Sequence, residues 1–248
     1  MPAGALRPLK TAERIALAIV REIVELGLDA GDPLPKEADL TEKYSASRAS
    51  VREALRLLEV QGLIEVHRGS HVGTTVGEVR AANLARTLTL YFHMAGTTYD
   101  EIFDTWFVIE PLLVESATRN PDKERVAQLI GPFAGIENFE WETYVNLHDA
   151  VFTLASNRAL AFLGRAVGML SAIMLRDVSE ERVGEFSEDY RRIASAVLSG
   201  DATLARAAMS QHIEQVIEMH KQLSPERVGA RVTSDEIEQI QLAALRVS

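Results

Sequence analysis

The sequence predicts a mostly α-helical protein with two domains: a small N-terminal domain of three helices and a β-hairpin, and a larger antiparallel bundle of helices. Apolar residues recur at helical spacing through most of the 248 residues. Apolar and polar residues alternate convincingly at one place only, in "LIEVHRGSHVGTTV". The balance of charge also changes just after that stretch, and this change marks the boundary between the domains.

The negative charge is concentrated in the second domain. Residues 1–76 contain ten Lys and Arg against eleven Asp and Glu, whereas residues 77–248 contain 16 against 25. The net charge of −10 therefore belongs mainly to the C-terminal part of the chain. If the protein binds a polyanion such as DNA, it must use a local basic patch in the first domain.

The composition excludes several classes of protein. The absence of cysteine rules out disulfides, a catalytic thiol and a thiolate metal site. The chain has no run of 18 apolar residues, so no membrane span is expected. The stretch "MPAGALRPLK" lacks the apolar core of a signal peptide. We therefore expect a cytoplasmic protein with no membrane partner.

Three helices are expected before the hairpin. The first covers residues 10–26 and ends at the glycines and prolines of "GLDAGDPLP". The second covers residues 36–44. The third covers residues 48–61, with Ser47 as its N-cap and Gly62 as its C-terminal stop. The hairpin that follows completes the first domain.

Beyond Gly77 the pattern is helical throughout. The short breaks between helices, among them "GPFAG", favour an antiparallel bundle. The expected helices cover residues 78–94, 98–119, 121–130, 139–155, 157–178, 181–199 and 201–223. The expected domains are residues 1–76, a linker over 77–79, a helical domain over 80–224, and a tail over 225–248 that can form one further helix from about Ser234.

Three arginines give the third helix a basic face. Arg48, Arg52 and Arg56 are spaced four apart in "SRASVREALR". Such a row is common on solvated helices, so alone it says little. Here, however, it follows a short helix and precedes a hairpin, which is the order of a winged helix-turn-helix module. The recognition helix of that module presents its first residues to the major groove of DNA. The expected contacts are therefore made by Ser47, Arg48, Ala49, Ser50 and Arg52.

The N-terminal residues resemble the GntR family of bacterial transcription regulators. The resemblance covers nearly all of residues 10–75 and is carried by the Glu-x-x-Leu of the second helix, by "SRASVREALRLL", by "GLIE" and by the glycine-centred wing. It implies DNA contacts by Arg48, Ser50 and Arg52. It also implies that the wing reaches the minor groove through His67, Arg68 and Gly69. One departure is Ala38, where the family often has an arginine; Lys36 is a candidate substitute for that phosphate contact.

The helical domain is similar to the FCD-type ligand domain of the FadR subfamily. The similarity covers residues 80–223 and is carried by "IEPLLVESA", "LH-x8-N" and "MSQHI". Domains of this type resemble one another in a metal site made by an Asp and three His. Two of these positions match here, at His148 and His212. Tyr144 stands where the Asp is expected and Tyr190 where the middle His is expected.

A further departure concerns a ligand-contacting arginine, whose place is taken by Trp106, four residues before Glu110. Two imidazoles cannot saturate Zn²⁺, and a phenol is a rare ligand because its pKa is near 10. We therefore predict no cofactor and an incomplete metal site; if a metal binds, His148 and His212 are its ligands. Each of these residues, taken alone, is better explained as a core residue. Together they are expected to line one effector pocket, made by Trp106, Glu110, Tyr144, His148, Tyr190 and His212.

The leading hypothesis is a homodimeric, ligand-responsive regulator that binds a palindromic DNA operator. Repression is the commoner mode in the family. The aromatic replacements favour a larger, more apolar effector than a metal-chelated carboxylate, such as a lipid-derived or acyl-CoA-like molecule. A metal-dependent FCD regulator that senses a small carboxylate is one alternative, and a helical adaptor without DNA binding is another. An enzyme is not expected, because the chain has no nucleophile elbow, phosphate loop or HExxH motif.

Overall fold

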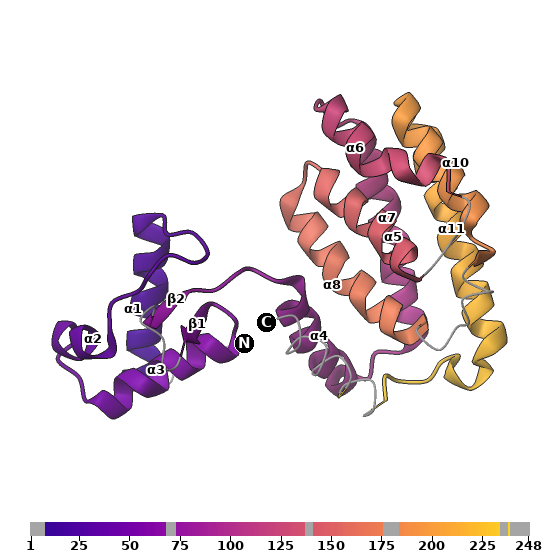
Figure 1. Ribbon diagram of the computed structural model, residues 1–248. Helices are drawn as coiled ribbons and strands as arrows, with labels where there is room; N and C mark the ends of the chain where they lie inside the picture. The colour runs from indigo at the N-terminus through magenta and orange to yellow at the C-terminus, as the bar shows by residue number, and fades with distance from the viewer. Residues whose placement is uncertain (1–7, 68–72, 137–140, 176–183, 234–237, 239–248) are drawn as a thin grey trace, which may run out of the picture. The chain divides into compact units, whose positions relative to one another are not determined.

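The computed structural model describes residues 8–67, 73–136, 141–175, 184–233 and 238, without the side chains of 141–144 and 173–175. The chain divides into two compact units, one up to Asn83 and one from Leu84 onward. Figure 1 shows the small unit with the hairpin and the larger helical unit. The predicted fold class, mostly helical with a short two-stranded sheet, is confirmed.

The first unit contains three helices and a hairpin. Helix α1 is Thr11–Leu26, α2 is Glu37–Lys43 and α3 is Arg48–Val60. Strand β1, Ile64–His67, pairs antiparallel with β2, Gly73–Val76. In this register Ile64 lies opposite Val76, so two apolar side chains enter the core at the same level. The three helices and the hairpin therefore occur in the predicted order.

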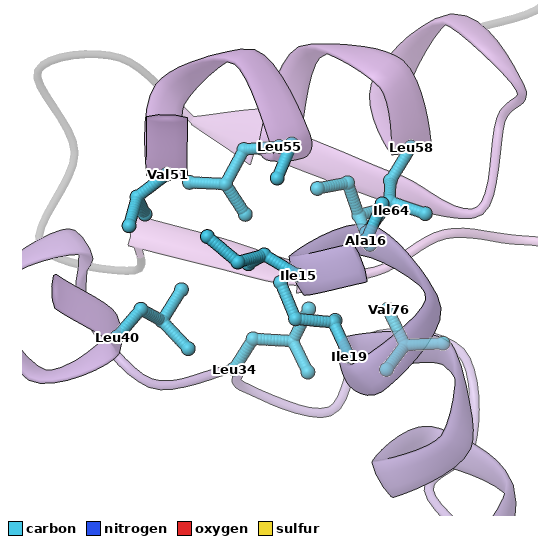
Figure 2. Packing of buried hydrophobic residues seen from close by; sticks show 11 residues of the cluster. Ile15, Ala16, Ile19, Leu34, Leu40, Val51, Leu55, Leu58, Ile64 and Val76 are labelled. Carbon is cyan, nitrogen blue, oxygen red and sulfur yellow. The ribbon is translucent and has the colours of Figure 1, made fainter. Parts of the chain in front are cut away.

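One apolar core holds these five elements together. Side chains from α1, α3 and the hairpin converge in it, and Leu40 closes it from α2 (Figure 2). The buried members of this core are Ile15, Ala16, Ile19, Leu34, Leu40, Val51, Ala54, Leu55, Leu58, Ile64 and Val76. The third helix ends as predicted, because Gly62 adopts a φ of 72° that reverses the chain into β1. The wing is thus attached rigidly to the end of α3.

The second unit is a bundle built around one long helix. Helix α5 packs against α7, α8, α10 and α11, and it lies among them in Figure 1. Its buried positions recur three or four residues apart and form one broad face from Tyr99 to Thr118, which packs against these neighbours. The described helices of this unit are α4 (Ala81–Ala95), which begins at the boundary between the units, α5 (Tyr99–Thr118), α6 (Lys123–Ala134), α7 (Trp141–Leu154), α8 (Arg158–Leu175), α10 (Ser187–Ser199) and α11 (Ala202–Leu223).

Two predicted helix boundaries are wrong. The helix expected over residues 181–199 is interrupted by a turn at Glu185 and Phe186, so α10 begins at Ser187. At this turn the buried ring of Phe186 packs edge-on against His212. The glycine and proline of "GPFAG" were expected to stop α6 at residue 130, but the helix continues through Pro132 to Ala134. Phe133 explains the difference, since it is buried and its ring lies edge-on to Tyr190, 6.5 Å between centroids. Tertiary packing of this aromatic residue outweighs the local preference for a break.

The segment after α11 crosses the junction between α4 and α5. A short 3₁₀ turn, Pro225–Arg227, leads into an extended stretch in which Arg231 bridges Thr98. The ring of His93 on α4 lies 2.9 Å from the carbonyl oxygen of Val232, whose side chain is buried. This stretch, residues 225–233, is called the C-terminal strap below. The further helix predicted from Ser234 lies outside the described residues.

Truncation of Leu58 tests the core of the first unit. Leu58 is 2% exposed, so Leu58→Ala should lower the free energy of unfolding of this unit by about 2 to 5 kcal/mol. Val60→Ala on the same helix is the control, because Val60 is 55% exposed and its truncation should change little. Thermal unfolding followed by circular dichroism measures both. Equal effects of the two substitutions would contradict the assignment of this core.

Candidate functional site

The N-terminus of α3 carries a compact group of small polar residues. Ser47 caps the helix, since its hydroxyl oxygen accepts a hydrogen bond from the backbone N–H of Ser50 at 3.1 Å. The two hydroxyls lie 3.0 Å apart. Arg48 and Ala49 are exposed beside them. The first turn of α3 thus combines a small profile with one exposed guanidinium, as a helix entering a groove requires.

Arg52 is fixed by an ion pair that connects two helices. Its Nε donates to both carboxylate oxygens of Glu37 on α2, at 2.9 and 3.0 Å. The Arg52 side chain is still 70% exposed. Glu37 therefore orients the guanidinium while its outer nitrogens remain accessible. In the sequence, Glu37 is recognisable only as part of the family pattern. The ion pair between Glu37 and Arg52 becomes visible only in the three-dimensional structure.

The other predicted DNA contacts lie on α2 and the wing. Lys36 is the exposed N-cap residue of α2. His67 lies at the end of β1, with Nε2 3.1 Å from the hydroxyl oxygen of Thr75 on β2. Arg68 and Gly69 lie outside the described residues.

A buried carboxylate organises the centre of the bundle. Glu110 on α5 is 0% exposed. It accepts hydrogen bonds from the indole N–H of Trp106 and from Nδ1 of His148 on α7. A carboxylate only accepts, so Nδ1 carries the proton and Nε2 is the acceptor of the imidazole. The hydroxyl of Tyr190 on α10 donates to this Nε2 at 2.8 Å. These four residues are called the Glu110 chain.

A second buried pair lies next to the Glu110 chain. Nδ1 of His212 on α11 is 3.4 Å from a carboxylate oxygen of Asp189, which also pairs with Arg192. The ring of His212 lies 5.6 Å from His148 and 5.1 Å from Tyr190, measured between centroids. Burial lowers the pKa of His212, although the Asp189 carboxylate opposes this shift. Asp189 was not among the predicted site residues. Its position next to Tyr190 in the sequence was the one signal that could have pointed to it.

The structure thus brings together most of the predicted pocket residues, but not around one empty space. Trp106 and His148 line a cavity of about 260 Å³ between α5, α7 and α8. Glu110, Tyr190 and His212 are instead packed into the hydrogen-bonded cluster beside that cavity. The side chain of Tyr144 lies outside the described residues.

The described residues do not fit the metal centre that the resemblance to FCD domains implies. Within the described part of the chain, no three His, Asp or Glu side chains are placed to hold one ion. The Nε2 atom of His148, which would be a ligand, instead accepts the Tyr190 proton. The loss of the metal site is therefore a prediction that metal analysis of the purified protein can test.

A winged helix-turn-helix unit followed by a helical bundle with a buried polar site defines a class of protein, the DNA-binding transcription regulators. Residues 11–76 match the family described as "Bacterial regulatory proteins, gntR family", and residues 101–215 match the FCD domain. The chain therefore contains a GntR-family helix-turn-helix domain and an FCD domain. The family and the relatives below are regulators of transcription, not enzymes.

Three known proteins illustrate the relationship. The Exu regulon transcriptional regulator of Escherichia coli K12 is 26% identical over 84% of this chain and 83% of its own length. LutR of Bacillus subtilis is 26% identical over 76% of this chain and 91% of its own length. The solved structure of Streptococcus agalactiae GntR covers 84% of this chain and 99% of its own, with a TM-score of 0.60 and 22% identity, and so supports the fold. Among the described helices none is long and apolar enough to cross a membrane.

The hydroxyl of Tyr190 can be tested separately from its ring. Tyr190→Phe removes the hydroxyl that donates to His148, and the loss of this buried hydrogen bond should cost about 1 to 2 kcal/mol of stability. Tyr91→Phe is the matched control, because Tyr91 is 66% exposed. Chemical denaturation of both variants compares the two losses. If the Tyr190→Phe protein is as stable as the control, the hydrogen bond from Tyr190 to His148 in the Glu110 chain is contradicted.

The lowered pKa of His212 predicts acid sensitivity. In the unfolded chain His212 takes up a proton near its ordinary pKa of 6.5. In the folded protein this pKa is lower, so below pH 6.5 the unfolded state binds more protons than the folded state. The free energy of unfolding should therefore fall as the pH falls from 6.5 toward the lower pKa of the folded state. Above pH 6.5 His212 should cause no such loss. Denaturation at several pH values measures the slope. His212→Gln should flatten it, and an unchanged slope would contradict the argument.

Proposed function

We propose that this GntR-family protein is a regulator of the FadR subfamily whose affinity for a DNA operator is altered by a small apolar effector. It acts in the cytoplasm as a homodimer on a palindromic operator, as a repressor. The observation that carries the proposal is the surface at the start of α3. There Ser47, Arg48 and Ser50 stand exposed or half-exposed above a buried core.

The chemistry of this surface suits DNA. Arg48 can donate two hydrogen bonds to a guanine edge, and the small neighbours allow close approach to the bases. Arg52, braced by Glu37, and Lys36 supply positive charge for phosphates. His67, Arg68 and Gly69 belong to the wing that is proposed to reach the minor groove. The charge of the whole protein is negative, so these local contacts must carry the binding.

Dimerisation follows from the size of the DNA-binding unit. A single winged helix of nearly neutral charge makes few contacts, whereas two linked units on a palindrome gain from their effective concentration. The helical domain is proposed to hold the two units together and to bind the effector. Relatives described as regulators of the Exu regulon and of the Uxu operon suggest that this protein likewise controls a regulon or an operon.

The effector hypothesis is supported by the cavity beside the Glu110 chain. An apolar body that enters between α7 and α8 contacts Trp106 and His148 directly, and so reaches residues that hold α5, α7 and α10 together. A volume of about 260 Å³ suits a short lipid-derived chain or one ring, but not a complete acyl-CoA. Binding would shift the population of bundle conformations and thereby the operator affinity.

Selection of bound duplexes from a random DNA library, followed by fluorescence anisotropy, tests DNA binding. Arg48→Ala should weaken binding to the selected duplex by about 10-fold or more, because one bidentate base contact contributes about 1 to 3 kcal/mol. Arg125→Ala is the control, since it removes the same charge from the exposed surface of α6. Affinity should also fall steeply with salt.

Two outcomes would contradict the proposal. If no duplex is enriched, the protein is the helical adaptor considered above. If Arg48→Ala and Arg125→Ala bind the selected duplex equally, the contact surface lies elsewhere.

A further inference from the structure

The cavity between α5, α7 and α8 has an unusual distribution of polarity. Its walls are formed mainly by apolar and aromatic side chains, and Arg165 on α8 is the one cation among the lining residues that the structure describes. Asp149 on α7 lines it as well. The apolar walls include Trp106, Val145, Phe152, Met169 and Ala172. A charged group at the border of an apolar cavity is typical of sites that orient an amphipathic ligand.

Arg165 is held in place by contacts on three sides. Its Nε donates to Oδ1 of Asp149 at 2.8 Å. Its Nη2 reaches the backbone oxygen of Asp149 at 3.4 Å and the hydroxyl of Thr153 at 3.1 Å. The guanidinium also lies over the ring of Phe152, 5.7 Å from the centroid. These contacts fix the plane of the guanidinium with little freedom left in the side chain.

One nitrogen of this guanidinium is available to a ligand. Within the described residues, no group accepts a hydrogen bond from Nη1 of Arg165. The side chain is 34% exposed, so an incoming molecule can reach it. A carboxylate suits this position, because it accepts a charge-assisted hydrogen bond from Nη1 and carries the opposite charge.

We propose that this cavity binds a monocarboxylate with a compact apolar body, with the carboxylate on Arg165 and the body between Trp106 and Met169. The inference deepens the proposed function, on which it rests for its regulatory meaning, by naming the class of effector. It differs from a metal-chelated carboxylate, because the cation here belongs to the protein.

The same geometry excludes other ligand classes. A dicarboxylate would place its second charge against apolar walls or against Asp149, and both are unfavourable. A neutral apolar molecule would fill the walls but would gain no charge-assisted hydrogen bond from Nη1 of Arg165. A molecule as large as an acyl-CoA exceeds a volume of about 260 Å³. A carboxylate with one ring or a short chain satisfies both the cation and the walls.

The tryptophans allow a direct binding measurement. The chain has two, Trp106 and Trp141. In a Trp141→Phe background the fluorescence reports on Trp106 alone, in the wall of the cavity. The probes are octanoate and phenylacetate, each compared with its uncharged amide at neutral pH. At least one acid should change the fluorescence with an affinity about 10-fold higher than that of its amide, because a charge-assisted hydrogen bond is lost in the amide.

Two pairs of variants separate the charge from the walls. Arg165→Gln should reduce acid binding to the level of the amide. Asp149→Asn should retain or tighten it, because it removes the carboxylate that competes for Arg165. Ala172→Leu should weaken binding of acid and amide alike by filling the cavity. Ala159→Leu, an exposed position on the same helix, should not. Thermal unfolding of each variant shows whether it is folded.

The inference is overturned if neither acid binds at millimolar concentration, if amides bind as tightly as acids, or if Arg165→Gln binds like its parent. Anisotropy with the selected duplex separates this result from the proposed function. If DNA binding persists without acid binding, only the ligand class fails. If acids bind but no duplex does, the cavity is confirmed and the regulator hypothesis fails.

Discussion

The buried carboxylate of Glu110 is the constraint on which the arrangement of the bundle depends. A carboxylate removed from water is costly unless donors surround it, and here the indole of Trp106 and the imidazole of His148 supply them. Because Tyr190 then completes the other side of the imidazole, one buried charge fixes the mutual position of α5, α7 and α10. The His212 ring extends the cluster to α11 by packing on His148 and Tyr190. Four helices thus share one polar centre that tolerates little displacement.

The residues that depart from the family pattern form a consistent set. Trp106 replaces a cation, yet its N–H still serves Glu110. Tyr190 replaces an imidazole, and its hydroxyl satisfies the lone pair that His148 would otherwise offer to an ion. This cluster is closed by its own hydrogen bonds, and two of its members, Trp106 and His148, also line the adjoining cavity. Arg165 lines the same cavity.

The C-terminal strap links this centre to the beginning of the bundle. It continues from α11, which contains His212, and its backbone pairs with the junction between α4 and α5 at Thr98. His220, buried on α11, packs on Phe103 at 4.8 Å between ring centroids. Helix α4 in turn continues the chain from the DNA-binding unit. Covalent connection and the strap therefore provide a continuous path of packed residues between the polar centre and α4.

The sequence by itself determined the elements that depend on local rules. Helix periodicity, the Ser47 cap, the Gly62 reversal and the alternation of the wing are properties of neighbouring residues, and α1 to α3 and the hairpin were predicted in the right order for that reason. The residue types of Trp106, His148 and His212 also indicated a site in the bundle. Only the tertiary structure decided the features that depend on contacts between residues far apart in the sequence. The continuation of α6 through Pro132 depends on the burial of Phe133. The pairing of Arg52 with Glu37, of Asp189 with His212 and of Arg165 with Asp149 joins different helices, and no spacing along the chain encodes which charges meet across a packed interface.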